Sequence, residues 1–142
     1  MPAEYYHFTN AARCEQGATF SRVFTLCSNL TEAEKYAIST GTVTTAQQSS
    51  IDSKTRNLTG YTARMHVRTA IDAASATITL TTENGGITLG GTAGTVTITI
   101  TATATAAVTA ATYYYDLELI AAAGSVERLF QGRFEVDPEV TR

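Results

Sequence analysis

The feature that most restricts the fold of this chain is the regular alternation of threonine with aliphatic side chains in residues 94–104. Val96, Ile98 and Ile100 take every second position, and threonine takes the positions between them. Successive side chains of a β-strand point to opposite faces, so a period of two predicts a strand with one apolar and one polar face. Threonine is β-branched and fits a half-exposed pleated surface, which strengthens this prediction.

Several other segments show strand patterns of the same kind. They are residues 19–27, 61–68, 76–82, 112–121 and 126–136, and residues 5–12 are either a further strand or an extended arm. Residues 82–91 contain Asn-Gly and Gly-Gly pairs, which predict turns because they accept positive φ values. We interpret residues 102–111 as a short connection, although their alanines could form a turn of helix.

The number and spacing of these segments predict the fold class. Six or seven strands joined by short turns are typical of an all-β fold. We therefore expect a single antiparallel β-sandwich of about seven strands, immunoglobulin-like, forming one domain over residues 1–142.

Residues 28–56 depart from the strand pattern, because they are polar and poor in large apolar side chains. Thr31 and Glu34 have the spacing of a capping box, which predicts a short helix over residues 32–38. The rest, residues 39–56, is expected to be a long loop. Loops of this length are usually functional or disordered, so the insertion is either a partner-binding excursion or a plain surface loop.

Charge and hydropathy exclude several classes of protein. The 142 residues carry a formal net charge of -3, and the few Lys and Arg are scattered, whereas nucleic-acid binding needs clustered positive charge. We find no apolar run of the roughly 20 residues that a membrane span needs, and no signal-peptide pattern at the start. We therefore expect neither nucleic acid nor a membrane as partner, and assembly in the cytoplasm. In that compartment Cys14 and Cys27 are expected to be thiols.

No residue pattern indicates catalysis or a cofactor. His7 and His66 are the two histidines, and their spacing from the cysteines requires neither a Cys–His nucleophile nor a zinc site, which commonly takes ligands in close pairs. We therefore expect no catalytic residues, no metal and no cofactor, and a protein that is not an enzyme.

Two acidic residues on one strand allow two interpretations. Asp116 and Glu118 lie two residues apart and share a face, which could suit a metal or an acid–base pair. Arg128 and Arg133 lie in the next strand along the chain. We favour cross-strand ion pairs.

Three consecutive tyrosines mark the start of that strand. Alternation places Tyr113 and Tyr115 in the core, with their hydroxyl groups reaching a polar edge. Tyr114 then faces outward and is a candidate contact residue, because exposed aromatic side chains are enriched at interfaces.

Several motifs carry a family resemblance: Leu-Thr-Gly-Tyr-Thr-Ala-Arg-Met at 58–65, Tyr-Asp-Leu-Glu-Leu at 115–119, and Pro-Glu-Val-Thr-Arg at 138–142. Together they resemble a family of small virion structural proteins of tailed bacteriophages. The layout is also similar to the N-terminal β-domain of phage baseplate upper proteins, which docks onto the tail hub. Family members tend to replace residues 28–56 by a short turn.

The resemblance implies a non-enzymatic virion structural protein, a tail or baseplate adaptor present in symmetric copies. Its expected partners are other virion proteins and copies of itself, and its location is the virion. A capsid cement or decoration protein is one alternative, and a carbohydrate-binding module is an alternative from another class.

The candidate partner-contact residues come from the insertion, the outward tyrosine and the extended tail over residues 137–142. That tail could add a strand to a neighbour by β-augmentation, or it could be frayed. The candidates are Tyr114, Glu32, Lys35, Tyr36, Gln47, Gln48, Pro138, Val140 and Arg142.

Overall fold

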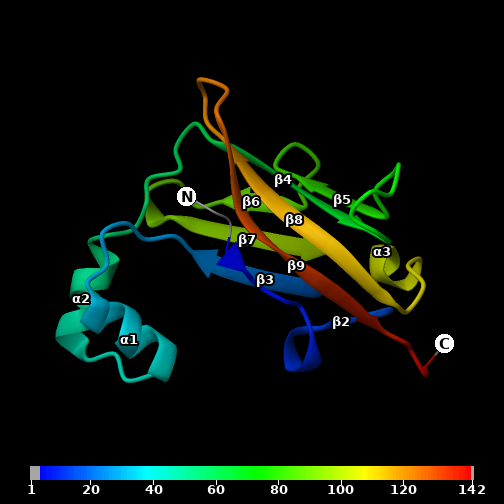
Figure 1. Ribbon diagram of the computed structural model, residues 1–142, viewed down its shortest axis with the longest axis horizontal. Coiled ribbons are helices and arrows are strands. Elements are labelled where there is room, and N and C mark those ends of the chain that lie inside the picture. The colour runs from blue at the N-terminus through cyan, green and yellow to red at the C-terminus, as the bar shows by residue number, and fades with distance from the viewer. Residues whose placement is uncertain (1–3, 142) are drawn as a thin grey trace.

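Two β-sheets dominate the computed structural model, which describes residues 4–141 (Figure 1). The larger sheet has the order β1 (Glu4–Tyr5), β9 (Val126–Asp137), β8 (Thr112–Ile120), β4 (Thr62–Arg68) and β5 (Ile78–Thr81), with β2 (Cys14–Glu15) also paired to β9. The smaller sheet has the order β3 (Phe20–Thr25), β7 (Thr95–Ile100) and β6 (Ile87–Leu89).

The predicted alternation decides which strand faces form the core. On β7, Val96, Ile98 and Ile100 are almost fully buried while the threonines between them are partly exposed. Strand β4 shows the same pattern with Met65 and Val67. Buried side chains of both sheets belong to one hydrophobic cluster, so the expectation of a mostly β protein is confirmed.

The N-terminal segment runs parallel to β9, and this corrects the expectation of a purely antiparallel fold. Glu4 pairs with Phe130, Phe8 bridges to Phe134, and Cys14 pairs with Val136, all in the parallel sense. Each N-terminal strand has only two residues, too few to show any alternation in the sequence. Residues 5–12 therefore combine part of a strand, a bridge and a 3-10 turn, η1 (Asn10–Ala12).

Other differences from the predicted fold concern short elements. The described chain has nine strands instead of about seven, because β2 and β6 are too short to stand out in the sequence. Strand β7 ends at Ile100 because the Thr101 side chain accepts a hydrogen bond from the Ala104 amide (3.2 Å) and starts α3 (Ala102–Ala106). The expected short connection after β7 is therefore a helix. A second 3-10 turn, η2 (Gly91–Ala93), precedes β7.

An aromatic cluster fixes the N-terminal segment against both sheets. The Phe8 ring lies 5.4 Å from the rings of Phe20 on β3 and Phe134 on β9, measured between centroids, in edge-to-face geometry. Tyr115 on β8 lies 4.9 Å from Phe8, and its hydroxyl donates to the Tyr6 carbonyl (2.5 Å). Edge-to-face pairs add to the free energy gained by burial, so this cluster joins the N-terminal segment to both layers.

A glycine lets this segment come close to β9. A Cβ atom at Gly132 would meet the carbonyl oxygen of Tyr6. The absence of a side chain at position 132 thus permits the close pairing that places Phe8 in the core.

The three consecutive tyrosines lie as predicted. Tyr113 and Tyr115 are 4% and 6% exposed, whereas Tyr114 is 40% exposed. The Tyr113 hydroxyl donates to the carbonyl of Thr109 (2.6 Å), and burial raises the pKa of this phenol. The core therefore holds both rings with their polar ends paired.

Cys14 and Cys27 are free thiols, as expected. Burial raises the pKa of Cys14 to about 11, so this thiol is a poor nucleophile at neutral pH.

Among residues 4–141, no helix has both the length and the hydropathy to cross a membrane.

We predict that Phe8→Ala lowers the free energy of unfolding by about 3–5 kcal/mol, because it removes the central ring of the cluster. Urea denaturation followed by far-UV circular dichroism measures this change. Tyr5→Ala is the matched control on the same segment, because Tyr5 is 74% exposed, and we expect a change within about 0.5 kcal/mol. Equal effects of the two substitutions would contradict the role given to Phe8.

Candidate functional site

The insertion at residues 28–56 forms a helical hairpin that projects from one end of the molecule (Figure 1). Helix α1 (Glu32–Thr40) confirms the predicted short helix and extends it by two residues. Helix α2 (Thr45–Asp52) lies where a long loop was expected, so that expectation was wrong. The hairpin is thus an ordered element.

Two capping boxes start these helices. Thr31 accepts from the Glu34 amide (3.2 Å), while the Glu34 carboxylate accepts from the Thr31 amide (2.9 Å). Thr44 and Gln47 repeat the arrangement at 3.2 Å and 3.0 Å. Gly41 ends α1 in the left-handed conformation, with φ of 69°. The second box has the same sequence spacing as the first, so this signal could have identified α2.

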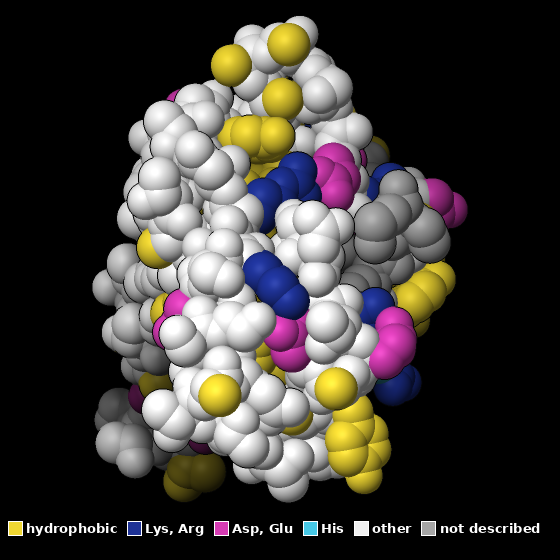
Figure 2. Space-filling model, turned by 90° about the vertical axis from the view of Figure 1, so that its left-hand side faces the viewer, with side chains coloured by type: hydrophobic (Ala, Val, Ile, Leu, Met, Phe, Trp, Pro, Cys, Tyr) yellow, Lys and Arg dark blue, Asp and Glu magenta, His cyan; other side chains and the backbone are white. Residues whose placement is uncertain are grey.

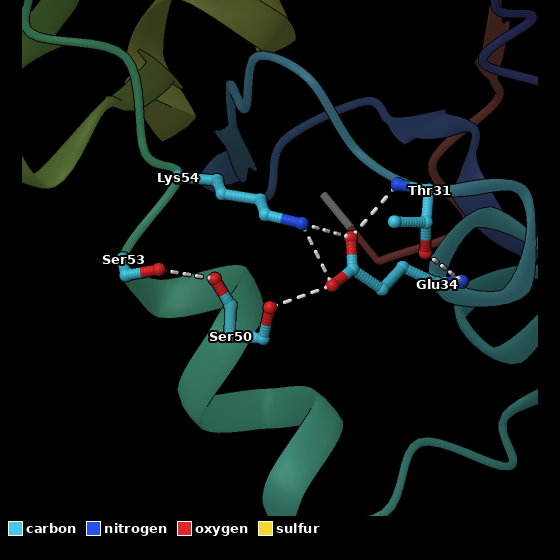
Figure 3. Close-up of polar contacts among 5 residues, drawn as sticks. All are labelled: Thr31, Glu34, Ser50, Ser53 and Lys54. Atoms are coloured by element: carbon cyan, nitrogen blue, oxygen red, sulfur yellow. Dashed lines mark hydrogen bonds and ion pairs between the residues drawn. The ribbon is translucent and has the colours of Figure 1, made fainter.

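Glu34 is the polar centre of the hairpin (Figure 3). Its side chain is 7% exposed and accepts from the Lys54 ammonium at 2.9 Å and 2.8 Å and from the Ser50 hydroxyl at 2.7 Å. Hydrogen bonds from Lys54, from Ser50 and from the Thr31 amide lower the pKa of Glu34 to about 2. One carboxylate therefore connects α1, α2 and the segment that leaves the hairpin.

The base of the hairpin is tied to the sandwich by paired backbone and by an ion pair. The Ser28 amide donates to the Lys54 carbonyl (2.9 Å), and the Arg56 amide donates to the Leu26 carbonyl (2.8 Å). The Arg56 guanidinium binds both carboxylate oxygens of Glu127 at 3.2 Å and 2.6 Å. This contact raises the pKa of Arg56 and lowers the pKa of Glu127. The hairpin is thereby anchored to the start of β9.

The hairpin end of the molecule has a mainly polar surface. Figure 2 shows hydrophobic side chains as separate small spots, with Lys and Arg side chains next to Asp and Glu side chains. Tyr36 and Ile38 on α1 are 69% and 49% exposed. Lys35 pairs with Glu32 (3.1 Å) on the same helix. Tyr36 therefore offers a large aromatic surface in polar surroundings.

The predicted contact residues lie in three separate regions of the structure: the hairpin, strand β8 and the C-terminal tail. Glu32, Lys35 and Tyr36 lie on α1, and Gln47 and Gln48 lie on α2. The two glutamines already serve the hairpin, because Gln47 completes a capping box and the Gln48 amide donates to Asp52 (2.7 Å).

The remaining predicted contacts lie away from the hairpin. Tyr114 lies on β8, and the C-terminal tail leaves β9 at the opposite end from the hairpin (Figure 1). Pro138 and Val140 are exposed, and Arg142 falls outside the described residues. No single surface holds all the predicted contacts within residues 4–141.

The C-terminal tail is partly fixed. The Gln16 amide donates to the Asp137 carbonyl (3.0 Å), and the Glu139 amide donates to the Gln16 side chain (3.0 Å). Arg13 pairs with Asp137. The contacts described for the tail end at Glu139, whereas Pro138 is exposed and Val140 is 92% exposed.

Cross-strand ion pairs hold both acidic residues of β8, as predicted, although one partner differs. Arg128 binds Asp116 at 3.3 Å, and Arg64 on β4 binds Glu118 at 2.7 Å. Arg133, expected as a partner, lies opposite Tyr114. Arg64 is instead the direct cross-strand partner of Glu118 on the other side of β8.

A groove on the outer face of the larger sheet was not predicted. It has a volume of about 420 Å³. Its lining includes Tyr5, His66, Arg68, Tyr114, Arg128 and Arg133. We call it the outer-face groove. These residues are far apart in the sequence, and only the register of the strands brings them together.

Nothing in the described part of the chain groups three or more His, Cys, Asp or Glu side chains as a metal site would require.

Comparison with known proteins gives no family: no protein-family model matches the chain, and a search of curated proteins finds no significant match.

The pKa of Glu34 makes the hairpin sensitive to acid. A carboxylate whose pKa falls from 4.5 to about 2 on folding stabilises the hairpin fully above pH 4.5. This stabilisation is lost as the pH falls from 4.5 towards 2, because the unfolded state takes up a proton in this range while the folded carboxylate stays ionised. We expect the hydrogen-exchange protection factors of the amides in α1 and α2 to fall in this range before those of β4 and β8 do.

Two substitutions test the assignment to Glu34. Glu34→Gln should expose the hairpin amides to exchange already at pH 7 and remove the acid transition. Glu32→Gln is the control on the same helix, because Glu32 is largely exposed, and it should leave the transition in place. Unchanged exchange in Glu34→Gln would refute the assignment.

Proposed function

We propose that this chain is a non-enzymatic structural subunit of a bacteriophage virion, a tail or baseplate adaptor that docks in symmetric copies. The helical hairpin is its docking element. The observation that carries the proposal is the exposed Tyr36 on a hairpin that is capped, internally paired and anchored to the sandwich. A rigid aromatic side chain in polar surroundings is typical of residues that dominate the energy of a protein interface.

The strand order supports an immunoglobulin-like sandwich for this subunit. The order β3-β7-β6 corresponds to strands B, E and D of that fold, and β9-β8-β4-β5 corresponds to G, F, C and C′. The hydrogen bond from Tyr113 to the Thr109 carbonyl lies at the start of the F-equivalent strand, where such domains have a tyrosine corner. Domains of this architecture serve many functions, so the fold alone assigns none.

The phage resemblance and the hairpin contribute different parts of the proposal. The matching motifs lie mostly in the framework, where Leu58, Met65 and Leu117 are buried. They support a shared core. The hairpin occupies the place where the family has a short turn, so it is the surface by which this subunit would differ from the others and recognise its own neighbour.

Substitution of the aromatic anchor tests the proposed docking. We expect Tyr36→Ser to reduce incorporation of the chain into particles at least about tenfold, since interface anchors often contribute 2 kcal/mol or more. Quantitative mass spectrometry of purified particles measures the incorporation. Val126→Ser is the matched control, because Val126 is an exposed hydrophobic residue (51%) outside the hairpin. Wild-type incorporation of Tyr36→Ser would exclude the hairpin as the docking element.

Truncation of the tail tests whether the tail makes a docking contact in addition to that of the hairpin. Removal of residues 140–142 leaves the Gln16–Glu139 hydrogen bond intact, so the fold should persist. If the tail adds a strand to a neighbour, the truncated chain should be lost from particles although its melting temperature is unchanged. Normal incorporation would assign docking to the hairpin without the tail.

The number of copies per particle distinguishes the tail placement from the capsid alternative. A ring in the tail or baseplate requires a small multiple of its rotational symmetry. A cement protein requires a number that matches the capsid lattice. Comparison with a coat protein of known copy number, on the same gel, gives the ratio.

A further inference from the structure

The outer-face groove is built from two rows of side chains that cross the larger sheet. Gln131 on β9, Asp116 on β8 and His66 on β4 are direct cross-strand partners, and Tyr5 on β1 extends this row beyond Gln131. The adjacent row consists of Arg133, Tyr114 and Arg68. Residues directly opposite in a sheet lie on the same face. Strand pairing therefore fixes the positions of all seven residues.

The groove has an excess of positive charge on a chain whose net charge is -3. Its one acidic lining residue is Asp116, which Arg128 pairs at 3.3 Å. Arg68 and Arg133 form no ion pair with any carboxylate within residues 4–141. Two guanidinium groups, one on each side of Tyr114, are therefore available to an anion.

Arg68 is held in position by two contacts. Its guanidinium donates to the Ala73 carbonyl (2.9 Å) and lies 3.3 Å from Nδ1 of His66. A guanidinium has only donors, so this contact requires Nδ1 of His66 to accept. These two contacts use two of the five N–H groups of Arg68 and leave three. The planar guanidinium can therefore donate two parallel hydrogen bonds to a carboxylate.

Exposed aromatic rings accompany the cationic groups. Tyr114 is 40% exposed between the two arginines, and Tyr5 is 74% exposed at the end of the other row. Tyrosine rings in open polar sites offer an apolar face to a ligand while their hydroxyl groups stay in water. A ligand for this groove should therefore combine an anionic group with a flat, weakly polar face.

Asp116 adds a requirement for hydrogen-bond donors in the ligand. Arg128 contacts Oδ2 of Asp116, and Oδ1 accepts no hydrogen bond from the described residues. A carboxylate oxygen beside cationic groups suits a ligand that carries hydroxyl groups near its own anionic group. A bare phosphate gains less from this acceptor. The volume of about 420 Å³ lies in the range of small-molecule sites.

We propose that the outer-face groove binds a sugar acid, a saccharide whose ring carries a carboxylate. The carboxylate binds between Arg68 and Arg133, the ring lies against Tyr114, and a ring hydroxyl donates to Asp116. This proposal does not depend on the hairpin or on particle assembly, so either proposal can fail alone.

The test uses trigalacturonic acid as the probe and the uncharged galactose trisaccharide as its matched control. Titration into ¹⁵N-labelled protein, followed by NMR, should shift the amide resonances of Arg68, Tyr114 and Arg133 with the acidic trisaccharide. Arg133→Gln should weaken binding at least about tenfold (about 1.4 kcal/mol), because it removes a charge-assisted hydrogen bond. Arg133 makes no side-chain hydrogen bond in the described chain, so this variant should keep the wild-type melting temperature.

Two further variants locate the site. Tyr114→Ala should weaken binding to a similar extent, and Arg22→Gln on β3 should leave it unchanged, because Arg22 belongs to the other sheet. Equal binding of the two trisaccharides would overturn the role of the carboxylate. Equal shifts with inorganic phosphate would overturn the assignment to a sugar, and no shifts with trigalacturonic acid would overturn the proposal as a whole.

Discussion

The packing of Phe8 is the interaction on which the rest of the structure depends. Its ring contacts the aromatic side chains of β3, β8 and β9, and so it joins the N-terminal segment to both sheets. The pairing of that segment with β9 follows from this anchor and from the missing side chain at Gly132. The outer-face groove depends on it in turn, because Tyr5 reaches the groove only when the segment lies along β9.

The sandwich and the hairpin are stabilised by different physical effects. Both sheets share one apolar core, whose burial gives a cooperative unit. The hairpin buries only Glu34, Ala37 and Ile51, and its order comes from two capping boxes and one carboxylate that collects four donated hydrogen bonds. A polar element of this kind opens at a lower free energy than the core. Recognition at the hairpin can therefore change without loss of the framework.

The sequence predicts those parts of the structure that repeat a local pattern. Alternation locates β4, β7 and β8 with their buried faces, and the Thr31–Glu34 spacing locates α1. Helix α2 was missed because it has one buried residue, Ile51, and so no apolar periodicity. The outer-face groove was out of reach, since it depends on the register of strands that bring His66, Tyr114 and Arg133 together. Register is a tertiary property that one strand does not encode.

The parallel pairing of the N-terminal segment with β9 has a mechanical consequence. The chain enters through β1 and β2 and leaves through β9, and these strands point in the same direction. A force that pulls the two ends of the chain apart would slide β2 along β9, so it would load their hydrogen bonds, the Arg13–Asp137 ion pair and the Phe8 contacts at the same time. Because this force acts on all of these contacts at once, β2 and β9 could not separate by breaking one hydrogen bond after another. A subunit held at its two ends would therefore resist tension at its terminal strands while its hairpin carried none of the load.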